Sequence, residues 1–249
     1  MLTHEVALHW IERWDRQQEG YLPDREARFT ALIDAVEALG RPDPVVIDLG
    51  CGPGSLSARL LERLPQATVI AVDADPLLLG LGRAAYPGLR FVSADLRTGG
   101  WTAALGLDRP ADAAVSTTAL HWISPEELQE TYAELAGVLR PGGVLLNGDH
   151  MDSSSPTLAR LERAVHQRET DRVFGDRLPE DWRSWWDAIS ADPAFADLNQ
   201  ERSTAGASHD GSESHLVEHH VNALTKAGFG EIGTLWQRGN NRLLCAVRS

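Results

Sequence analysis

Acidic residues and a run of alternating glycines carry the strongest chemical signal in the sequence. Asp48 directly precedes the glycine-rich run 50–54, and Asp73 and Asp95 each end a later apolar segment. Glycines let a backbone turn sharply and approach a ligand closely. A carboxylate at a strand end can accept both hydroxyls of a ribose, and another can accept from an exocyclic amine such as that of adenine. These residue types predict a site for a ligand that contains adenosine.

The elements that must position these residues alternate along the chain. Short apolar runs predict five strands, at residues 45–49, 68–73, 89–94, 111–117 and from 144 to 147. Helices are expected to open at Ser55, near Pro76 and at Pro125. Largely apolar strands that alternate with helices indicate a parallel sheet covered on both faces. Such sheets bind ligands at the carboxyl ends of their strands, so the three carboxylates are expected at one edge.

The remaining segments complete the expected fold. Helices are predicted at residues 4–19 and 25–39, and a turn at residues 140–143 precedes the fifth strand. Strands at residues 232–238 and 242–248 flank a Gly-Asn-Asn turn that suits a β-hairpin, because Gly and Asn tolerate positive φ. We therefore predict an α/β fold with a doubly wound, mostly parallel seven-stranded sheet. It carries an antiparallel C-terminal hairpin strand and a helical insertion after the fifth strand.

Composition excludes several classes of partner. The formal net charge is −13, and the arginines are interleaved with acidic residues, which argues against nucleic acid and anionic membranes. The two cysteines, Cys51 and Cys245, form neither a zinc site nor a disulfide framework. A reduced, cytoplasmic compartment is expected, with no signal peptide and no membrane span. The oligomeric state is left as monomer or homodimer.

Taken together and in this order, the motifs resemble those of the class I S-adenosylmethionine-dependent methyltransferases. The runs that carry the resemblance are residues 45–56, 69–75, 91–96, 112–122 and 139–146. The similarity covers roughly residues 25–150 and the terminal hairpin. The run 119–122, Ala-Leu-His-Trp, is similar to the small-molecule branch that includes trans-aconitate methyltransferase. The resemblance implies S-adenosylmethionine as cofactor, S-adenosylhomocysteine as product and a small-molecule acceptor.

The resemblance also assigns the cofactor-binding positions. Gly50, Cys51 and Gly52 are expected to hold the methionine part, and Asp48 to orient that loop or the amine. The remaining contacts are the ribose with Asp73, the adenine with Ala74, Asp95 and Leu96, and the methionine amine or methyl group with Thr117 and Thr118. Tyr21 and Arg25 resemble positions that close over the cofactor carboxylate. The family often has Asn where Thr117 stands, which leaves the amine contact open.

One domain, residues 1–249, is expected. Its N-terminal helices, residues 1–40, would close the cofactor site, and residues 151–218 would form a helical substrate cap. Three tryptophans of this insertion, Trp182, Trp185 and Trp186, fit two interpretations equally. They are either an aromatic wall for an apolar substrate or the core that packs the insertion on the sheet.

Histidines supply the candidate catalytic groups. His121 is either a general base or a structural histidine beside Trp122, and His150, after the fifth strand, is a candidate substrate contact. Four histidines between His209 and His220 include a pair four residues apart, His215 and His219. This spacing can serve a metal, but a solvated helix face is favoured and no metal is predicted. Cys51 is interpreted as a small loop residue rather than a nucleophile.

The expected reaction is an in-line displacement that transfers the methyl group from the sulfonium to the acceptor. Holding the reacting atoms in line supplies much of the catalysis, so a base is needed only for a protonated nucleophile. Two alternatives stay open. A nicotinamide-dependent oxidoreductase requires a G-x-G-x-x-G fingerprint, whose last position falls on Ser55. The other alternative is a non-catalytic protein that binds an adenosyl ligand.

Overall fold

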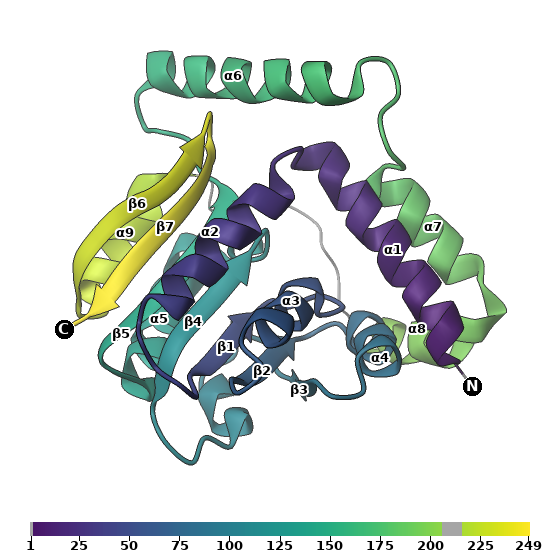
Figure 1. Ribbon diagram of the computed structural model, residues 1–249, viewed down its shortest axis with the longest axis horizontal. Coiled ribbons are helices and arrows are strands. Elements are labelled where there is room, and N and C mark those ends of the chain that lie inside the picture. Colours follow the sequence, from purple (N-terminus) through teal and green to yellow (C-terminus); the bar gives the residue numbers. More distant parts are fainter. Residues whose placement is uncertain (1, 206–215) are drawn as a thin grey trace.

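The computed structural model describes residues 2–205 and 216–249, and its centre is a seven-stranded sheet (Figure 1). The spatial order is β3-β2-β1-β4-β5-β7-β6. The strands are β1 Val45–Leu49, β2 Thr68–Asp73, β3 Arg90–Ser93, β4 Ala111–Thr117, β5 Leu139–His150, β6 Phe229–Arg238 and β7 Asn241–Arg248. The strands β1 to β5 pair in parallel, and β7 pairs antiparallel with both β5 and β6. The predicted fold class is confirmed.

Helices cover both faces of this sheet. They are α1 His4–Tyr21, α2 Arg25–Glu37, α3 Ser55–Arg63, α4 Pro76–Ala85, α5 Pro125–Val138, α6 Pro156–Phe174, α7 Trp182–Ala191, α8 Ala196–Ala205 and α9 Val217–Lys226. Phe29 of α2 and Leu56 of α3 pack with Val46 on one face. Tyr132 of α5 and Leu224 of α9 belong to the core on the other. Strands buried from both sides need apolar residues at every position, which is why β1 reads as a continuous apolar run with one acid.

Local signals explain where the helices begin. The Ser124 side chain accepts from the Glu127 N–H while the Glu127 carboxylate accepts from the Ser124 N–H, and Pro125 occupies the first turn of α5. Asp75 caps α4 by accepting from the Leu77 N–H at 2.9 Å. These caps fix the loops that leave β2 and β4 at the edge of the sheet where the pocket lies.

The predicted turn at residues 140–143 is wrong. This segment lies inside β5, where Leu139 pairs with Ala111 before the register shifts and Val144 pairs with Ala113. Gly142 has a φ of +70°, so the Pro-Gly-Gly sequence forms an irregularity within the strand. The Arg140 guanidinium donates to the buried Asp112 carboxylate at 2.8 Å. A strand can therefore absorb a turn-like sequence when its flanking residues stay paired.

The N-terminal helix and the insertion pack together beside the sheet. In Figure 1, α1 lies alongside α7, with α4 and α8 near its start. Trp10 and Trp14 of α1 meet the fully buried Trp185 edge-on, with ring centroids 5.8 Å and 4.8 Å apart. Trp186 is also buried, whereas Trp182 lines the pocket. The three tryptophans therefore divide between the two interpretations, two in the core and one at the pocket.

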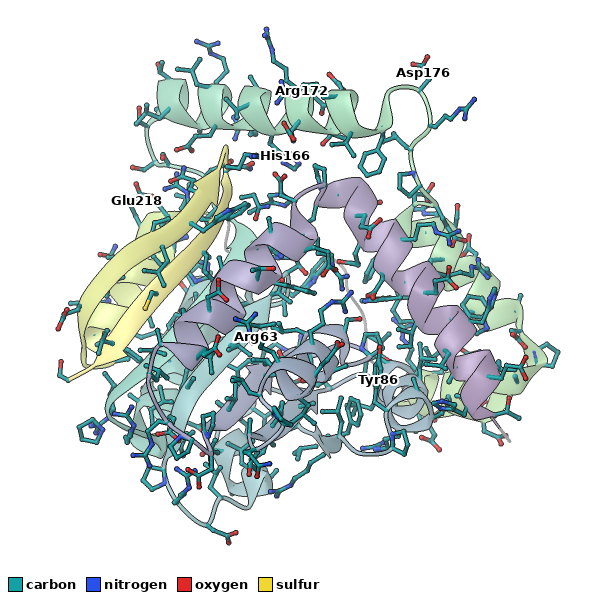
Figure 2. The ribbon with its side chains drawn as sticks, viewed as in Figure 1. Arg63, Tyr86, His166, Arg172, Asp176 and Glu218 are labelled. Atoms are coloured by element: carbon teal, nitrogen blue, oxygen red, sulfur yellow. The ribbon has the colours of Figure 1, made fainter. Side chains whose placement is uncertain are left out.

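The helix α6 crosses the far end of the molecule, beyond the tip of the hairpin (Figure 1). A Cβ at Gly239 in the hairpin turn would lie 2.5 Å from the Glu162 carbonyl oxygen of α6. His166 lies on the side of α6 that is turned toward the rest of the molecule (Figure 2). Close backbone contact at a glycine thus fixes how this helix docks on the sheet.

No helix in the described part of the chain combines the length and apolar character that a membrane crossing requires.

Candidate functional site

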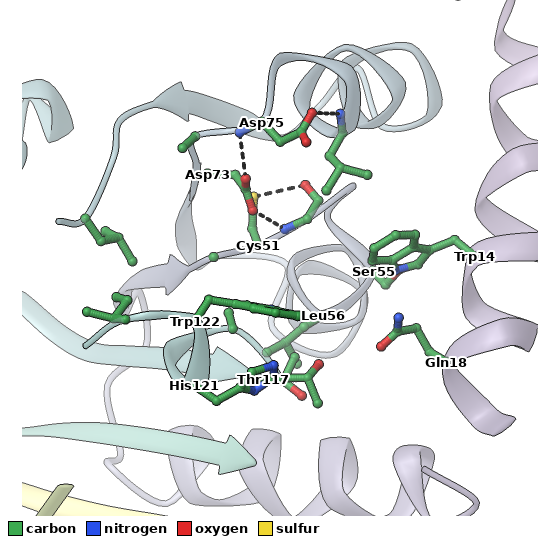
Figure 3. A pocket seen from close by; sticks show the side chains of 18 of the residues that line it. Trp14, Gln18, Cys51, Ser55, Leu56, Asp73, Asp75, Thr117, His121 and Trp122 are labelled. Carbon is green, nitrogen blue, oxygen red and sulfur yellow. Dashed lines mark hydrogen bonds between the residues drawn. The ribbon is translucent and has the colours of Figure 1, made fainter. Parts of the chain in front are cut away.

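A pocket of about 450 Å³ opens at the carboxyl ends of the parallel strands. Its walls come from α1 and α2, the loops after β1 to β4, the end of β5, the short 3-10 helix η2 Leu120–Trp122 and the start of α7. This volume is typical of a small-molecule site. Figure 3 shows the Asp73 and Cys51 side chains on one side of the pocket and His121 and Thr117 on the other.

The glycine-rich loop forms the floor beneath one end of the pocket. Gly50 and Gly52 line it with φ values of +65° and +55°, which favour glycine. A Cβ at Gly50 would lie 2.3 Å from the Ala119 Cβ, so only a glycine fits against the loop after β4. Cys51 lies between them, and its N–H donates to the Val72 carbonyl at 2.9 Å. The sequence thus leaves a backbone surface open to the pocket.

Asp73 joins this loop to the end of β2. Its carboxylate accepts from the Gly52 N–H at 2.8 Å and from the Asp75 N–H at 2.9 Å (Figure 3). Burial raises the pKa of Asp73 to about 6, against the lowering effect of these two backbone donors. The carboxylate is thus oriented by main chain at the lining of the pocket, beside Ala74.

Asp95 and Leu96 line the pocket after β3, but the Asp95 carboxylate has a partner of its own. Arg97 Nε and Nη2 donate to it at 2.9 Å and 2.8 Å. This contact lowers the pKa of Asp95 and keeps the group charged. With 35% of its side chain exposed, Asp95 lies at the mouth of the pocket rather than in its interior.

Asp48 lies outside the lining, beneath the glycine loop. It is fully buried, and one carboxylate oxygen accepts from the Ser57 hydroxyl at 2.6 Å. Burial raises the pKa of Asp48 to about 7. Of its two predicted roles, orienting the loop matches this location, while direct contact with a ligand amine does not.

Thr117 and Thr118 end β4 and line the middle of the pocket. The Thr117 hydroxyl contacts the Arg28 guanidinium. Thr118 has a φ of +51°, an uncommon conformation for a residue with a Cβ, and its N–H donates to the Gly148 carbonyl at 2.9 Å. The strand end is therefore held in a conformation that its own residue type disfavours.

The N-terminal helices reach the pocket through Tyr21 and Arg25. Arg25 is 4% exposed, and its Nη2 lies 2.9 Å from the Asp15 carboxylate. Its Nη1 has no hydrogen-bond partner within the described chain. The Tyr21 hydroxyl accepts from the Trp182 N–H at 3.1 Å, which ties α1 to the insertion. Both residues line the pocket, and a buried guanidinium with an unused donor fits a ligand carboxylate.

His121 and Asp149 form a pair at the opposite end of the pocket. The His121 Nδ1 lies 2.9 Å and 3.0 Å from the two carboxylate oxygens of Asp149, which is 1% exposed. Burial alone would lower the pKa of His121, but the Asp149 carboxylate outweighs burial and raises it. Burial alone would likewise raise the pKa of Asp149, yet His121 and Arg28 lower it to about 2.

His150 follows Asp149 and also lines the pocket. Its ring centroid is 4.6 Å from that of His166 on α6. Burial and His166 lower the pKa of His150 to about 3, so the imidazole is neutral near pH 7. Its Nε2 has no hydrogen-bond partner among the described residues.

The structure gives little support for a nucleophilic role of Cys51 or for a metal site at the histidine-rich segment. The Cys51 thiol donates to the Gly52 carbonyl at 3.3 Å, and burial raises its pKa, which makes it a poor nucleophile. His209 and His215 lie outside the described residues. His220 is buried, with its Nδ1 2.7 Å from the Tyr132 hydroxyl. Within residues 2–205 and 216–249, no three metal-ligating side chains are grouped.

Sequence reasoning missed Asp149 and Arg28. Asp149 directly precedes His150 at the end of β5, so its place at a strand end was a usable signal. Arg28 lies on the buried face of α2, and its Nη1 donates to the Asn241 side chain at 2.7 Å, 213 positions away in the chain. Nothing local in the sequence marks such a contact.

Comparisons with known proteins agree with this geometry. A model described as a methyltransferase domain matches residues 46–143. A trans-aconitate 2-methyltransferase of Azoarcus sp. (strain BH72) is 38% identical over 133 residues, which is 53% of this chain and 49% of that protein. The trans-aconitate 2-methyltransferase of Rhodopseudomonas palustris (strain BisB18) is 31% identical over 183 residues, covering 71% of this chain and 67% of that one. The chain thus spans about half to two thirds of these relatives' lengths.

Among solved structures, a similar one is magnesium protoporphyrin IX methyltransferase from Synechocystis PCC 6803 with bound S-adenosylhomocysteine. Its TM-score is 0.58 at 18% identity, with 96% of this chain and 94% of that chain covered. At this identity the likeness establishes a shared fold.

Proposed function

The chain belongs to the class I S-adenosylmethionine-dependent methyltransferases, and we propose that it transfers a methyl group from S-adenosylmethionine to a small-molecule acceptor. One observation carries the proposal. The glycine loop, Asp73 and Asp95 follow three neighbouring strands and line one cavity together with Thr117. This is the edge of an open α/β sheet at which such folds bind nucleoside ligands.

The cofactor end of the pocket, made by Gly50, Gly52, Asp73 and Asp95, suits an adenosyl ligand. Gly50 lines the pocket with its backbone, and its missing Cβ lets the loop after β4 pack directly against it at Ala119. Asp73 supplies acceptor oxygens for ribose hydroxyls, and Asp95 an acceptor for the adenine amine. The Nη1 of the buried Arg25, which lies 3.8 Å from the Glu26 carboxylate but has no hydrogen-bond partner in the described chain, is a donor for the cofactor carboxylate. When bound, the cofactor supplies a methyl group activated by its positive sulfonium.

The acceptor end, lined by His121 and His150 with Asp149 behind them, lies across the pocket from Asp73. The protein's task is to hold an acceptor atom in line with the transferred methyl group and to exclude water. We propose that residues 1–40 close the cofactor site and that residues 151–218 cap the acceptor. The hydrogen bond between Tyr21 and Trp182, which joins these two segments at the pocket, supports this division.

Asp73→Asn tests the cofactor site. The loss of a charged acceptor for two hydroxyls is expected to weaken S-adenosylhomocysteine binding by about 100-fold, measured by calorimetry at pH 7.5. Asp108→Asn, an exposed acid away from the pocket, is the matched control and should bind like the parent. Near-parental affinity in Asp73→Asn would remove the ribose assignment. Tight binding of NADH in place of S-adenosylmethionine would favour an oxidoreductase instead.

We also propose a cytoplasmic location and a monomer or homodimer without a nucleic-acid partner. Both cysteines are free thiols, as a reducing compartment favours. The net charge of −13 opposes binding to phosphate backbones.

A further inference from the structure

Four ionisable side chains from three elements meet at the acceptor end of the pocket. His121 comes from η2, Asp149 and His150 from the end of β5, and Arg28 from α2. His121 and His150 line the cavity, while Asp149 and Arg28 lie buried behind them. None of these four groups is among the residues assigned above to the cofactor. Their arrangement therefore concerns the acceptor.

Asp149 fixes the orientation of the His121 ring. Both carboxylate oxygens lie within 3.0 Å of Nδ1, and one of them also accepts from the His150 N–H at 2.8 Å. A carboxylate that accepts at Nδ1 holds the proton on that nitrogen. Nε2 is then the nitrogen of the neutral ring that can take up a proton. Because the ring lines the pocket, this is the arrangement of an oriented general base.

We propose that His121, oriented by Asp149, removes the hydroxyl proton of the acceptor, and that the acceptor is a phenol rather than a carboxylate. This inference rests on the proposed methyl transfer. The acceptor O–H proton passes to His121 Nε2. An oxygen lone pair forms the new O–CH₃ bond as the carbon–sulfur bond breaks, with its electron pair remaining on sulfur. The imidazolium then releases its proton to solvent.

The charges around His121 suit a base that works near neutral pH. Asp149 raises the pKa of His121, whereas burial and the Arg28 guanidinium lower it. His150 is neutral because burial and His166 hold its pKa near 3. A phenol has a pKa of about 10, within reach of a base whose own pKa lies above its ordinary value, whereas an aliphatic alcohol is far less acidic.

Two features of the pocket disfavour a carboxylate acceptor. Carboxylates are already ionised near neutral pH, so their methylation needs no base. Of the arginines that line the pocket in the described chain, Arg97 is paired with Asp95, and Arg25, beside Asp15, is assigned above to the cofactor carboxylate. Trp122 and Trp182 line the same cavity, which gives its acceptor end an aromatic character.

The first test measures methyl transfer to matched sets of phenols, benzoates and benzylamines as formation of S-adenosylhomocysteine. Phenols should be methylated, with kcat/KM rising as the pH increases through the pKa of His121, because only the neutral ring accepts a proton. His121→Asn should lower kcat/KM for the phenol by about 100- to 1,000-fold and abolish this rise. Asp149→Asn should lower kcat/KM for the phenol by about tenfold. It should also move the increase in kcat/KM to lower pH, because the carboxylate that raises the pKa of His121 is lost.

The second test needs no turnover. In protein saturated with S-adenosylhomocysteine, the ring C–H signals of His121 are followed by NMR as a function of pH. Its pKa should lie above the ordinary histidine value and fall in Asp149→Asn. It should stay unchanged in the surface variants Asp108→Asn and His9→Asn, which also control for general loss of fold.

Each of the other possible results contradicts one part of the proposal. Methylation of benzoates or benzylamines but not phenols overturns the acceptor class, as does failure to methylate any phenol by protein that still binds S-adenosylmethionine. Activity that falls with rising pH through the pKa of His121 overturns the base, because a protonated ring would then anchor an anion. A protein that does not bind S-adenosylmethionine fails the proposed function itself, which calorimetry detects before any acceptor is added.

Discussion

The cofactor end and the acceptor end of the pocket are built in different ways. At the cofactor end, the contacts largely involve main chain, such as the Gly52 N–H to Asp73. At the acceptor end, the contacts run between side chains, such as His121 with Asp149, and Arg28 reaches Asn241, 213 positions away. A site for a shared cofactor is thus encoded in a local motif, while the acceptor site depends on how distant elements pack.

Gly50→Ala should have the largest effect and should act on the cofactor end. The new Cβ would lie 2.3 Å from the Ala119 Cβ, on a residue whose φ is +65°. The strain, about 1–3 kcal/mol from the backbone alone, should weaken S-adenosylhomocysteine binding by about 100-fold, measured by calorimetry.

Two further variants sharpen that result. Gly88→Ala places a Cβ where no atom lies within 4 Å and should bind the ligand like the parent. Gly50→Ala combined with Ala119→Gly removes the Cβ that causes the collision and should recover part of the affinity. If the double variant binds no better than Gly50→Ala, the backbone conformation rather than the contact with Ala119 limits binding.

The same contrast explains how far the sequence could be interpreted. The glycine run and the acids at strand ends are local signals, and their meeting at one sheet edge follows from parallel topology. The turn predicted at residues 140–143 was wrong because residues typical of turns also form irregularities inside strands. Arg28 was missed because its significance depends on tertiary contacts, which no spacing along the chain reveals, whereas Asp149 was missed although its position at a strand end was a usable signal.

Arg28→Met should have an intermediate effect, confined to the acceptor end and to stability. The buried guanidinium donates to Thr117 and Asn241, and its loss leaves these groups unpaired. A cost of about 2–4 kcal/mol in the free energy of unfolding is expected, measured by urea denaturation. The pKa of His121 should rise, because Arg28 opposes its protonation.

The matched control is Arg168→Met on the exposed face of α6, which should be neutral for stability. The affinity of Arg28→Met for S-adenosylhomocysteine should stay within about tenfold of the parent, since only the Thr117 contact connects it to the cofactor. A larger loss of affinity for S-adenosylhomocysteine, with an unchanged free energy of unfolding, would assign Arg28 to the cofactor end. The two ends of the pocket would then not be built independently.

Asp95→Asn should have the smallest effect, although the sequence gives Asp95 the same strand-end position as Asp73. The Asp95 side chain is 35% exposed and paired with Arg97, whose own side chain is 46% exposed. Exposed ion pairs contribute about 0–1 kcal/mol, and water competes for the adenine amine at this position. The affinity for S-adenosylhomocysteine should therefore fall by only about three- to tenfold by calorimetry. A loss of affinity as large as that of Asp73→Asn would mean that ligand binding buries the mouth of the pocket. The exposure of Asp95 in the free protein would then not determine how much its contact contributes to affinity.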